Sequence, residues 1–172
     1  MARVLSVLQS SPITNSNGKS VFCITDSFKT IFARYAKLKE QDGYNIYLDK
    51  CKERVFVKAD ELKISQVIYN LVDNAIKFSH DNSFIYVTVK EKGDKAQISI
   101  KDTGSGIAKK DIDKIWDRFY KSDASRGRDK KGSGLGLSIT KEIIQAHEEH
   151  IDVISTPDVG TEFIFTLPIA KG

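Results

Sequence analysis

Between residues 60 and 80, apolar side chains recur every three or four positions, which is the spacing of an amphipathic helix. At 100° per residue they form one stripe, made of Ile64, Val67, Ile68, Leu71, Ala75 and Phe78. Asp60 precedes the stripe and is a favoured residue type for capping a helix start. The pattern therefore predicts a long helix that opens at Asp60 and docks on an apolar core.

Two further helices and a series of strands are predicted around it. A capping Thr25 or Asp26 and a closing Gly43 delimit one helix, and residues 135–147 form the other. Alternating apolar residues predict strands at 21–24, 44–49, 54–59, 84–91, 96–102, 151–156 and 162–169. This order predicts an α+β fold, a two-layer α/β sandwich with a mixed sheet of about five strands and three helices on one face.

The composition excludes several classes of protein. With 172 residues, 40% hydrophobic content and a net charge of +4, the chain suits one globular domain and does not require a nucleic-acid surface. Its apolar runs are too short to span a membrane and its start lacks an export signal, which predicts a cytosolic protein. Cys23 and Cys51 have no partner at ligand spacing, so reduced, partly buried thiols are expected rather than a zinc site.

The polar side of the long helix is unusually rich in carboxamides. It carries Gln66, Asn70, Asp73, Asn74 and Lys77, although asparagine is a weaker helix former than Glu or Lys. An amide oxygen is a hard, neutral ligand suited to Mg²⁺, and a nearby lysine can meet a phosphate that the metal also touches. A solvated polar face that merely tolerates two asparagines is the alternative.

The segment "DTGSGI" follows the strand 96–102 directly. Asp102 at the strand end can accept a hydrogen bond from an exocyclic amine, which adenine has and guanine lacks at that position. Gly104 and Gly106 let the backbone approach a flat ligand closely. A glycine-rich turn that only leaves the strand is equally compatible with this segment.

A second glycine-rich segment, "GRDKKGSGLGL" at residues 127–137, runs into the last helix. Glycines before a helix expose backbone N–H groups where the helix dipole is positive, so phosphate binding and a bare hinge are both open. The basic, polar stretch 108–131 is typical of a mobile lid over an anionic ligand. Within it, "IWDRFYK" at residues 115–121 is too apolar for a free loop and is expected to dock.

Taken in order, these four segments resemble the catalytic, ATP-binding domain of sensor histidine kinases. That domain belongs to a superfamily shared with DNA gyrase, heat-shock chaperones and mismatch-repair ATPases. "NLVDNAIKFS" matches the N box, "DTGSGI" the G1 box, "WDRFYK" the F box and "GSGLGLSI" the G2 box, and "GTEFIFTLP" resembles the terminal strand. The resemblance implies a catalytic domain at 20–172 with a mobile ATP lid, preceded at 1–19 by the remnant of a dimerisation hairpin and a linker.

The resemblance also implies roles for individual residues, with ATP and Mg²⁺ as cofactors. Asn74 would be the Mg²⁺ ligand, while Asn70 and Lys77 would act catalytically at the metal and the phosphates. Asp102 would meet the adenine amine. The remaining implied nucleotide contacts are Gly104, Gly106 and Ile107 near the base, Tyr120 and Lys121 at ribose and phosphate, Gly132, Gly134, Leu135, Gly136 and Leu137 in the phosphate-side loop, and Thr161.

One substitution bears on the reaction type. Hydrolytic relatives carry a water-activating glutamate at the position of Asn70, and an amide cannot accept a proton at neutral pH. This favours transfer of the γ-phosphoryl group to a histidine over hydrolysis. No acceptor histidine in a hairpin context occurs here, because His80, His147 and His150 all lie inside or after the ATP-binding region. The sequence also departs from the family after His147, where "EEH" stands in place of the usual Gly-Gly turn.

The resemblance implies partners as well. The chain would act on its own missing dimerisation hairpin, a response regulator would receive the phosphoryl group, and the parent would be a homodimer anchored in the bacterial inner membrane. No nucleic acid and no direct membrane contact are expected for this part. The alternatives are a degenerate ATP-sensing docking module without kinase activity, an ATP-hydrolysing relative and an anti-sigma-factor serine kinase.

Overall fold

The protein is described by a computed structural model over residues 18–35, 45–50, 54–78, 83–120 and 136–170. The strands are β1 (Ser20–Cys23), β2 (Asn45–Lys50), β3 (Phe56–Ala59), β4 (Phe84–Lys92), β5 (Lys95–Asp102), β6 (Ile151–Thr156) and β7 (Gly160–Pro168). The helices are α2 (Ile24–Arg34), α4 (Glu61–Lys77) and α6 (Gly136–Ala146), with a 3₁₀ turn, η1, at Lys109–Asp111. The expected hairpin remnant falls almost entirely on residues 1–17, which lie outside the described ranges.

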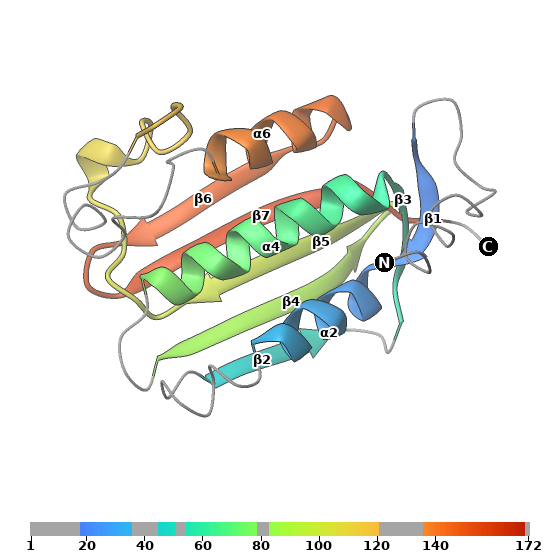
Figure 1. Ribbon diagram of the computed structural model, residues 1–172, viewed down its shortest axis with the longest axis horizontal. Coiled ribbons are helices and arrows are strands. Elements are labelled where there is room, and N and C mark those ends of the chain that lie inside the picture. The colour runs from blue at the N-terminus through green and yellow to red at the C-terminus, as the bar shows by residue number, and fades with distance from the viewer. Residues whose placement is uncertain (1–17, 36–44, 51–53, 79–82, 121–135, 171–172) are drawn as a thin grey trace.

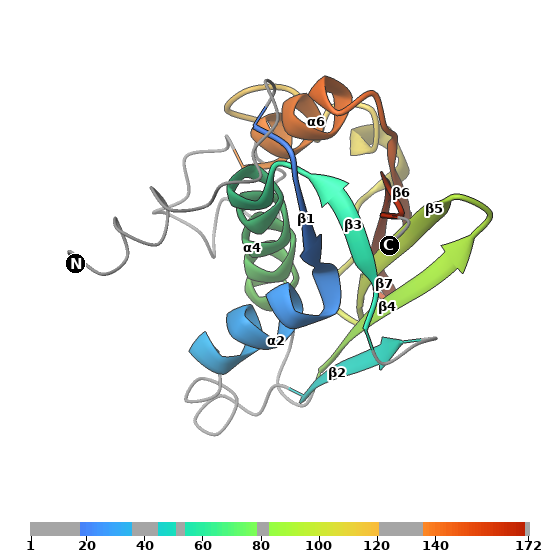
Figure 2. The ribbon, with the colours of Figure 1, turned by 90° about the vertical axis from the view of Figure 1, so that its right-hand side faces the viewer.

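Five strands form a mixed sheet in the order β2-β4-β5-β7-β6. The β2–β4 pair is parallel, and the other pairs are antiparallel. The helices α2, α4 and α6 lie side by side over one face of this sheet (Figures 1 and 2). The predicted α+β sandwich is confirmed.

One part of the topology was not expected from the sequence. β1 and β3 pair with each other in a separate two-stranded sheet. A bridge between Val57 and Ile169 ties this small sheet to the end of β7. The pairing joins segments more than thirty residues apart, and alternation within each strand says nothing about such distant partners.

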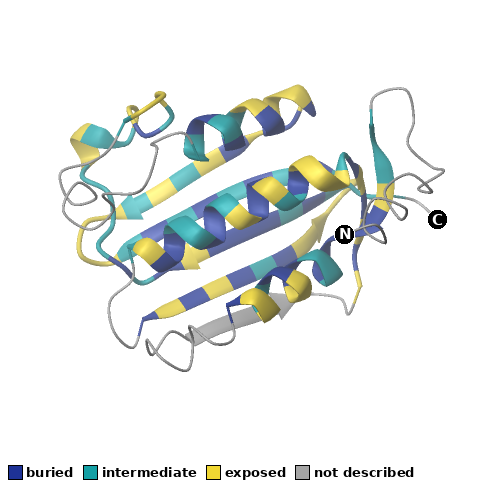
Figure 3. Cartoon of the chain, viewed as in Figure 1, coloured by how far each residue is buried: buried dark blue, intermediate teal, exposed yellow. Residues whose placement is uncertain are grey.

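The core lies between the sheet and the helices. Buried and exposed residues alternate along the first two thirds of β4, as Figure 3 shows, so one side of this strand faces the core. Phe28, Phe163 and Phe165 are among the largest side chains that are fully buried in this core. Within the described ranges, no helix is both long enough and apolar enough to cross a membrane.

The long helix α4 begins as predicted. Asp60 is its N-cap, and the Asp60 side chain accepts a hydrogen bond from the backbone N–H of Lys63 at 3.2 Å. The apolar stripe is buried against the core from Ile64 to Ala75, together with Val72 and Ile76, while Phe78 at the C-cap is only partly buried. The side that carries Asn70 and Asn74 stays partly exposed at the surface of the helical layer.

The predicted cap of α2 was wrong. The helix begins at Ile24 with Cys23 as the N-cap, and Thr25 and Asp26 lie inside its first turn. The buried Thr25 hydroxyl is within 2.9 Å of the Cys23 sulfur, while Asp26 pairs with Arg54 at 2.7 Å. Both residues are therefore engaged in contacts other than capping. The expected continuation of this helix to Gly43 falls on residues outside the described ranges.

The end of α6 has a conformation that glycine adopts more easily than any other residue. Glu148 has a φ of 59°, in the left-handed region, and the N–H of Glu149 donates to the carbonyl oxygen of Ile144 at 3.1 Å. This bond spanning five residues, with a left-handed residue inside it, is the Schellman closure of a helix. The "EEH" segment thus makes a turn that a glycine would make with less strain.

We expect Glu148→Gly to raise the free energy of unfolding by about 0.5–1 kcal/mol. The substitution relieves the left-handed strain of a residue with a Cβ, about 1–2 kcal/mol, and loses part of that gain through the greater freedom of glycine in the unfolded chain. Urea unfolding at pH 7 measures the difference. Glu148→Ala is the matched control and should be close to the wild type, because alanine keeps the Cβ. A less stable glycine variant would show that Glu148 contributes contacts that outweigh the strain.

Candidate functional site

The recognisable motifs meet at one end of the sandwich, on the left of Figure 1. The C-terminal half of α4, the end of β5, the start of β7 and the start of α6 all point there, although they are far apart in the sequence. Antiparallel pairing explains part of this arrangement, because Asp102 at the end of β5 is opposite Thr161 at the start of β7. The site is therefore assembled by the sheet and by the contact of α6 with α4.

Asp102 is a buried carboxylate, with 2% of its surface exposed. Its Oδ1 accepts a hydrogen bond from the backbone N–H of Gly104 at 2.8 Å. Burial raises the pKa of Asp102 to about 6, although hydrogen bonds from the backbone N–H groups of Gly104 and Thr161 oppose this change. A buried acid with backbone partners and a raised pKa at a strand end is a strong candidate for ligand recognition.

The glycines of "DTGSGI" are required first by the protein's own backbone. A Cβ on Gly104 would lie 2.1 Å from the carbonyl oxygen of Phe78, the residue that ends α4. That same carbonyl oxygen accepts the N–H of Ser105 at 3.1 Å. Gly106 has a φ of 71°, and its Cβ would lie 2.2 Å from the carbonyl oxygen of Thr156. These contacts lock the turn after Asp102 onto α4 and β6.

The turn is held from β6 and β7 as well. The Ser155 hydroxyl accepts the N–H of Ile107 at 2.7 Å and donates to the carbonyl oxygen of Gly160 at 3.0 Å. Since its hydrogen is used in that bond, the 2.8 Å contact with the Thr161 hydroxyl has Thr161 as the donor. Ile107 and Thr161, both predicted nucleotide contacts, thus share one partner beside Asp102.

Asn70 connects α4 to the start of α6. Its Nδ2 donates to the carbonyl oxygen of Gly136 at 3.3 Å and lies 3.4 Å from the Thr140 hydroxyl oxygen. The Thr140 hydroxyl itself donates to the Gly136 carbonyl at 2.8 Å. Because a carbonyl oxygen can only accept, the Asn70 amide must present its NH₂ group there, which leaves its Oδ1 to accept other bonds.

Asn74 and Lys77 follow Asn70 at helical spacing, one and two turns further along α4. Asn74 is partly exposed, and Lys77 forms an ion pair with Asp73 at 3.2 Å. Within the described residues there is no cluster of three or more His, Cys, Asp or Glu side chains that could enclose a metal ion. A metal at this site would therefore depend on amide oxygen, water and ligand oxygens, a set that suits Mg²⁺.

The base of the predicted lid docks as expected through three of its apolar side chains, but Phe119 does not, since 69% of its surface is exposed. Ile115 is buried, and Trp116 packs edge-on against Phe163 with ring centroids 5.8 Å apart. The ammonium group of Lys141 on α6 lies 5.1 Å from the centre of the Trp116 ring. Tyr120 packs partly buried against the same core, together with Leu137. The predicted contacts Lys121, Gly132, Gly134 and Leu135 lie outside the described ranges.

Besides Ser155, sequence reasoning missed two residues of this end. Gly160 is one, since a Cβ there would lie 2.0 Å from the carbonyl oxygen of Asp102. Thr140 is the other, because it is fully buried and contacts both Asn70 and Gly136. A threonine four residues after a helix-starting glycine was a usable signal, since such hydroxyls bond the carbonyl four residues back.

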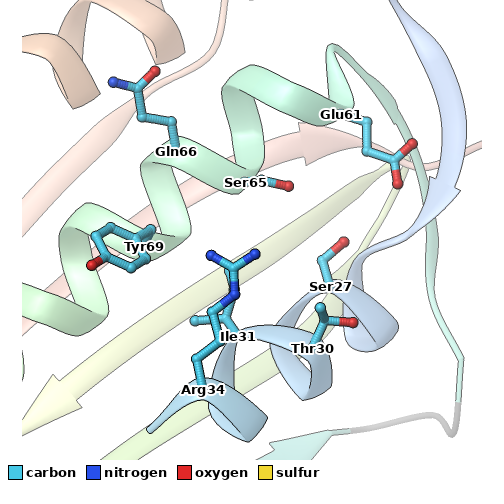
Figure 4. Close-up of a pocket in the computed structure, with 8 residues that line it drawn as sticks. All are labelled: Ser27, Thr30, Ile31, Arg34, Glu61, Ser65, Gln66 and Tyr69. Carbon is cyan, nitrogen blue, oxygen red and sulfur yellow. The ribbon is translucent and has the colours of Figure 1, made fainter. Parts of the chain in front are cut away.

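Gln66 does not join Asn70 and Asn74. A pocket of about 400 Å³ lies between α4 and α2, and Gln66 is among its lining residues, although Figure 4 shows its side chain directed away from α2. The lining residues are Ser27, Thr30, Ile31, Arg34, Glu61, Ser65, Gln66 and Tyr69. None of the predicted nucleotide contacts is among them, and Gln66 is exposed, in keeping with a solvated position.

Comparison with known proteins places this geometry in a family. The sequence profile of the histidine kinase-, DNA gyrase B- and HSP90-like ATPases matches residues 59–171. The sensor protein SrrB of Staphylococcus aureus is 38% identical over 154 residues, which is 90% of this chain and 26% of SrrB. The chain thus spans about a quarter of the length of that relative.

Solved structures agree with the fold. The nucleotide-free catalytic domain of histidine kinase ThkA superposes with a TM-score of 0.77 at 27% identity, over 87% of this chain and 97% of that domain. ShkA in complex with AMPPNP has a TM-score of 0.79 at 22% identity, over 98% of this chain and 35% of ShkA. ThkA in complex with the response regulator TrrA gives 0.74 at 24%, over 98% and 47%. The chain belongs to the histidine kinase-, DNA gyrase B- and HSP90-like ATPase family.

Proposed function

We propose that this chain is the ATP-binding catalytic domain of a two-component sensor histidine kinase. It transfers the γ-phosphoryl group of ATP to a histidine on a dimerisation hairpin, from which a response regulator receives it. The parent is a homodimer anchored in the bacterial inner membrane, with this domain in the cytoplasm. The similarity to SrrB and to the ThkA catalytic domain supports this assignment.

The observation that carries the proposal is the environment of Asp102. Its carboxylate is buried at the end of β5, held by the N–H of Gly104, and its pKa is raised by burial to about 6. A carboxylate that accepts from an exocyclic amine recovers part of the cost of its burial. Adenine supplies such an amine, whereas guanine presents a carbonyl group at that place. The site thus favours ATP over GTP.

The phosphates belong between α4 and the start of α6. Asn74 would hold Mg²⁺ through its amide oxygen, and when bound the ion neutralises charge on the phosphates. Lys77, which pairs with Asp73 in this structure, would contact a phosphate oxygen when the nucleotide is bound. Gly136 and Leu137 lie at the N-terminus of α6, where the backbone N–H groups and the helix dipole favour an anion.

Asn70 favours phosphoryl transfer over hydrolysis of ATP. Its amide donates to the Gly136 carbonyl and cannot remove a proton from water. Without a general base to activate water, the γ-phosphoryl group is transferred only to a nucleophile that is correctly positioned. The reaction then depends on alignment of that nucleophile and on neutralisation of the phosphate charge. The acceptor is a histidine of the hairpin. The complex of ThkA with the response regulator TrrA supports the next step of the relay.

The proposal is tested by calorimetric titration of this chain with AMPPNP and with the matching GTP analogue, each with and without Mg²⁺. We expect AMPPNP to bind in a Mg²⁺-assisted way and the GTP analogue to bind at least tenfold more weakly. Addition of ATP and a separately produced dimerisation hairpin should then phosphorylate the hairpin histidine. Binding without phosphorylation would favour an ATP-sensing docking module, and equal binding of both analogues would overturn the role of Asp102.

We expect Asn74→Ala to abolish Mg²⁺-assisted binding of AMPPNP, because it removes the amide oxygen assigned to the metal. Circular dichroism should show an intact fold, since Asn74 is only partly buried and alanine favours the helix. Gln66→Ala is the matched control, as it removes an exposed amide from the same helix outside the site. An Asn74→Ala chain with wild-type affinity in Mg²⁺ would disprove the metal assignment.

Asp102→Asn should make the chain more stable and a poorer binder. The folded-state pKa of about 6 lies above the usual 3.8, so protonation stabilises the wild type below pH 4 and this stabilisation is lost as the pH rises through 6. At pH 7 the ionised group destabilises the wild type by about 3 kcal/mol, part of which asparagine restores. The affinity for AMPPNP should fall by about 1–3 kcal/mol.

Two measurements over a pH range check this trade-off. Urea unfolding at pH 7 and pH 4 should show a stability gain for Asp102→Asn that disappears at the lower pH. Calorimetry should show that the wild-type affinity for AMPPNP weakens below pH 6, while that of the variant does not. Asp152→Asn, the same change at an exposed carboxylate on β6, should alter neither quantity. A variant that loses stability at pH 7 would contradict the burial argument.

A further inference from the structure

His147 connects the C-terminal end of α6 to the N-terminal end of α4. It is buried, with 6% of its surface exposed. Its Nδ1 lies 2.7 Å from the carbonyl oxygen of Ile143, one turn earlier in α6. Its Nε2 accepts the backbone N–H of Asp60, the N-cap of α4, at 3.0 Å. A single ring therefore joins two helix ends that are 87 residues apart in the sequence.

The two partners determine the state of the ring. A carbonyl oxygen can only accept, so the hydrogen must be on Nδ1, and a backbone N–H can only donate, so Nε2 must carry a lone pair. Both nitrogens of the neutral ring are thus used in directional bonds. This leaves no lone pair on the ring that could act as a phosphoryl acceptor. The role of His147 is therefore to hold the two helix ends together.

A second polar contact joins the same helices at their other end. There, Asn70 of α4 donates to the carbonyl oxygen of Gly136, where α6 begins. Along α4 the two contacts are ten residues apart, and along α6 eleven, which corresponds to about 15 Å in each helix. The two helices run in opposite directions, so the pair of contacts fixes both the register and the rotation of α6 on α4.

Apolar packing alone would fix this arrangement less strictly. Ile143 and Ile144 of α6 are buried in the core, but hydrophobic contact has no preferred direction and allows small sliding movements. The start of α6 carries Gly136 and Leu137, which bind phosphate in the proposed function. A slide of α6 along α4 would therefore move the phosphate-binding N–H groups relative to Asn74.

We propose that His147 is a positioning residue for the nucleotide site. By holding the N-cap of α4, it sets the register of α6 and so places the start of α6 opposite the asparagines of α4. This inference rests on the proposed ATP-binding function and extends it to a residue at the far end of both helices. His147 contacts no part of the site itself, and it acts through the two helices.

Two amide substitutions separate the bonds of His147. His147→Gln places an amide oxygen near the position of Nε2 and can still accept the N–H of Asp60. His147→Asn is too short to reach Asp60 and keeps only the bond within α6. We expect the asparagine variant to bind AMPPNP in Mg²⁺ about three- to tenfold more weakly, and the glutamine variant to stay within about twofold of the wild type. Calorimetry on folded protein measures both.

A readout inside the site distinguishes positioning from general stability. The side-chain NH₂ resonances of Asn70 in a ¹⁵N-correlated NMR spectrum should shift in His147→Asn and return to the wild-type position in His147→Gln. A purely structural histidine would lower the unfolding midpoint but leave these resonances and the affinity unchanged. That result in a folded His147→Asn chain would overturn the proposal.

A variant that does not fold can be distinguished from a failure of the proposed function. If His147→Asn does not fold, His147→Phe keeps the ring volume and removes both bonds, and wild-type affinity in that variant would overturn the proposal. If neither folds, the decision falls to His147→Gln, where an affinity more than twofold below the wild type would overturn it. Absence of AMPPNP binding by the wild type would reject the proposed function instead, and the Asn70 resonances would still report the register of α6.

Discussion

The burial of one face of α4 is the constraint on which the rest of the structure depends. Ile64, Val67, Leu71 and their neighbours are buried, so the rotation of this helix on the sheet is fixed. Asn70 and Asn74 consequently point away from the core at one end of the sandwich. Three segments are attached to α4: the turn after β5 at the carbonyl group of Phe78, the start of α6 at Asn70, and the end of α6 at Asp60.

Asp102 is an exception to the apolar packing around it. The surrounding backbone closes around it, with Gly104 and Gly160 each too close to a carbonyl oxygen to carry a side chain. Burial raises the pKa of Asp102 to about 6, which makes the charge unfavourable without a ligand donor. A sequence optimised only for stability would not keep a carboxylate here. A binding site, in contrast, gains selectivity from a buried carboxylate whose hydrogen-bonding capacity only one kind of ligand fulfils.

The parts predicted from the sequence are those that a local pattern encodes. The α4 stripe, its Asp60 cap and the β4–β5 hairpin each follow from residues close together in the chain. The errors and omissions involve distant partners. At the start of α2, Asp26 pairs with Arg54, 28 residues away, and the β1–β3 pairing and the Asn70–Gly136 bond likewise join distant segments. Periodicity carries no information on such contacts. Only the resemblance of the motifs to those of the family predicted that these segments lie in one site.

The turn after α6 has the geometry of a glycine turn although its sequence lacks the expected glycines. Glutamates stand where the resemblance implies Gly-Gly, yet Glu148 adopts the left-handed conformation and the helix ends with the Schellman pattern of bonds that glycine commonly makes. The next carboxylate, Glu149, is buried, where it pairs with Lys95 of β5 and accepts the Thr166 hydroxyl of β7. Those contacts offset the strain at Glu148 by anchoring the turn to the sheet. His147 precedes this turn, and its backbone N–H still bonds the carbonyl oxygens of Ile143 and Ile144, so α6 itself directs the ring to the start of α4.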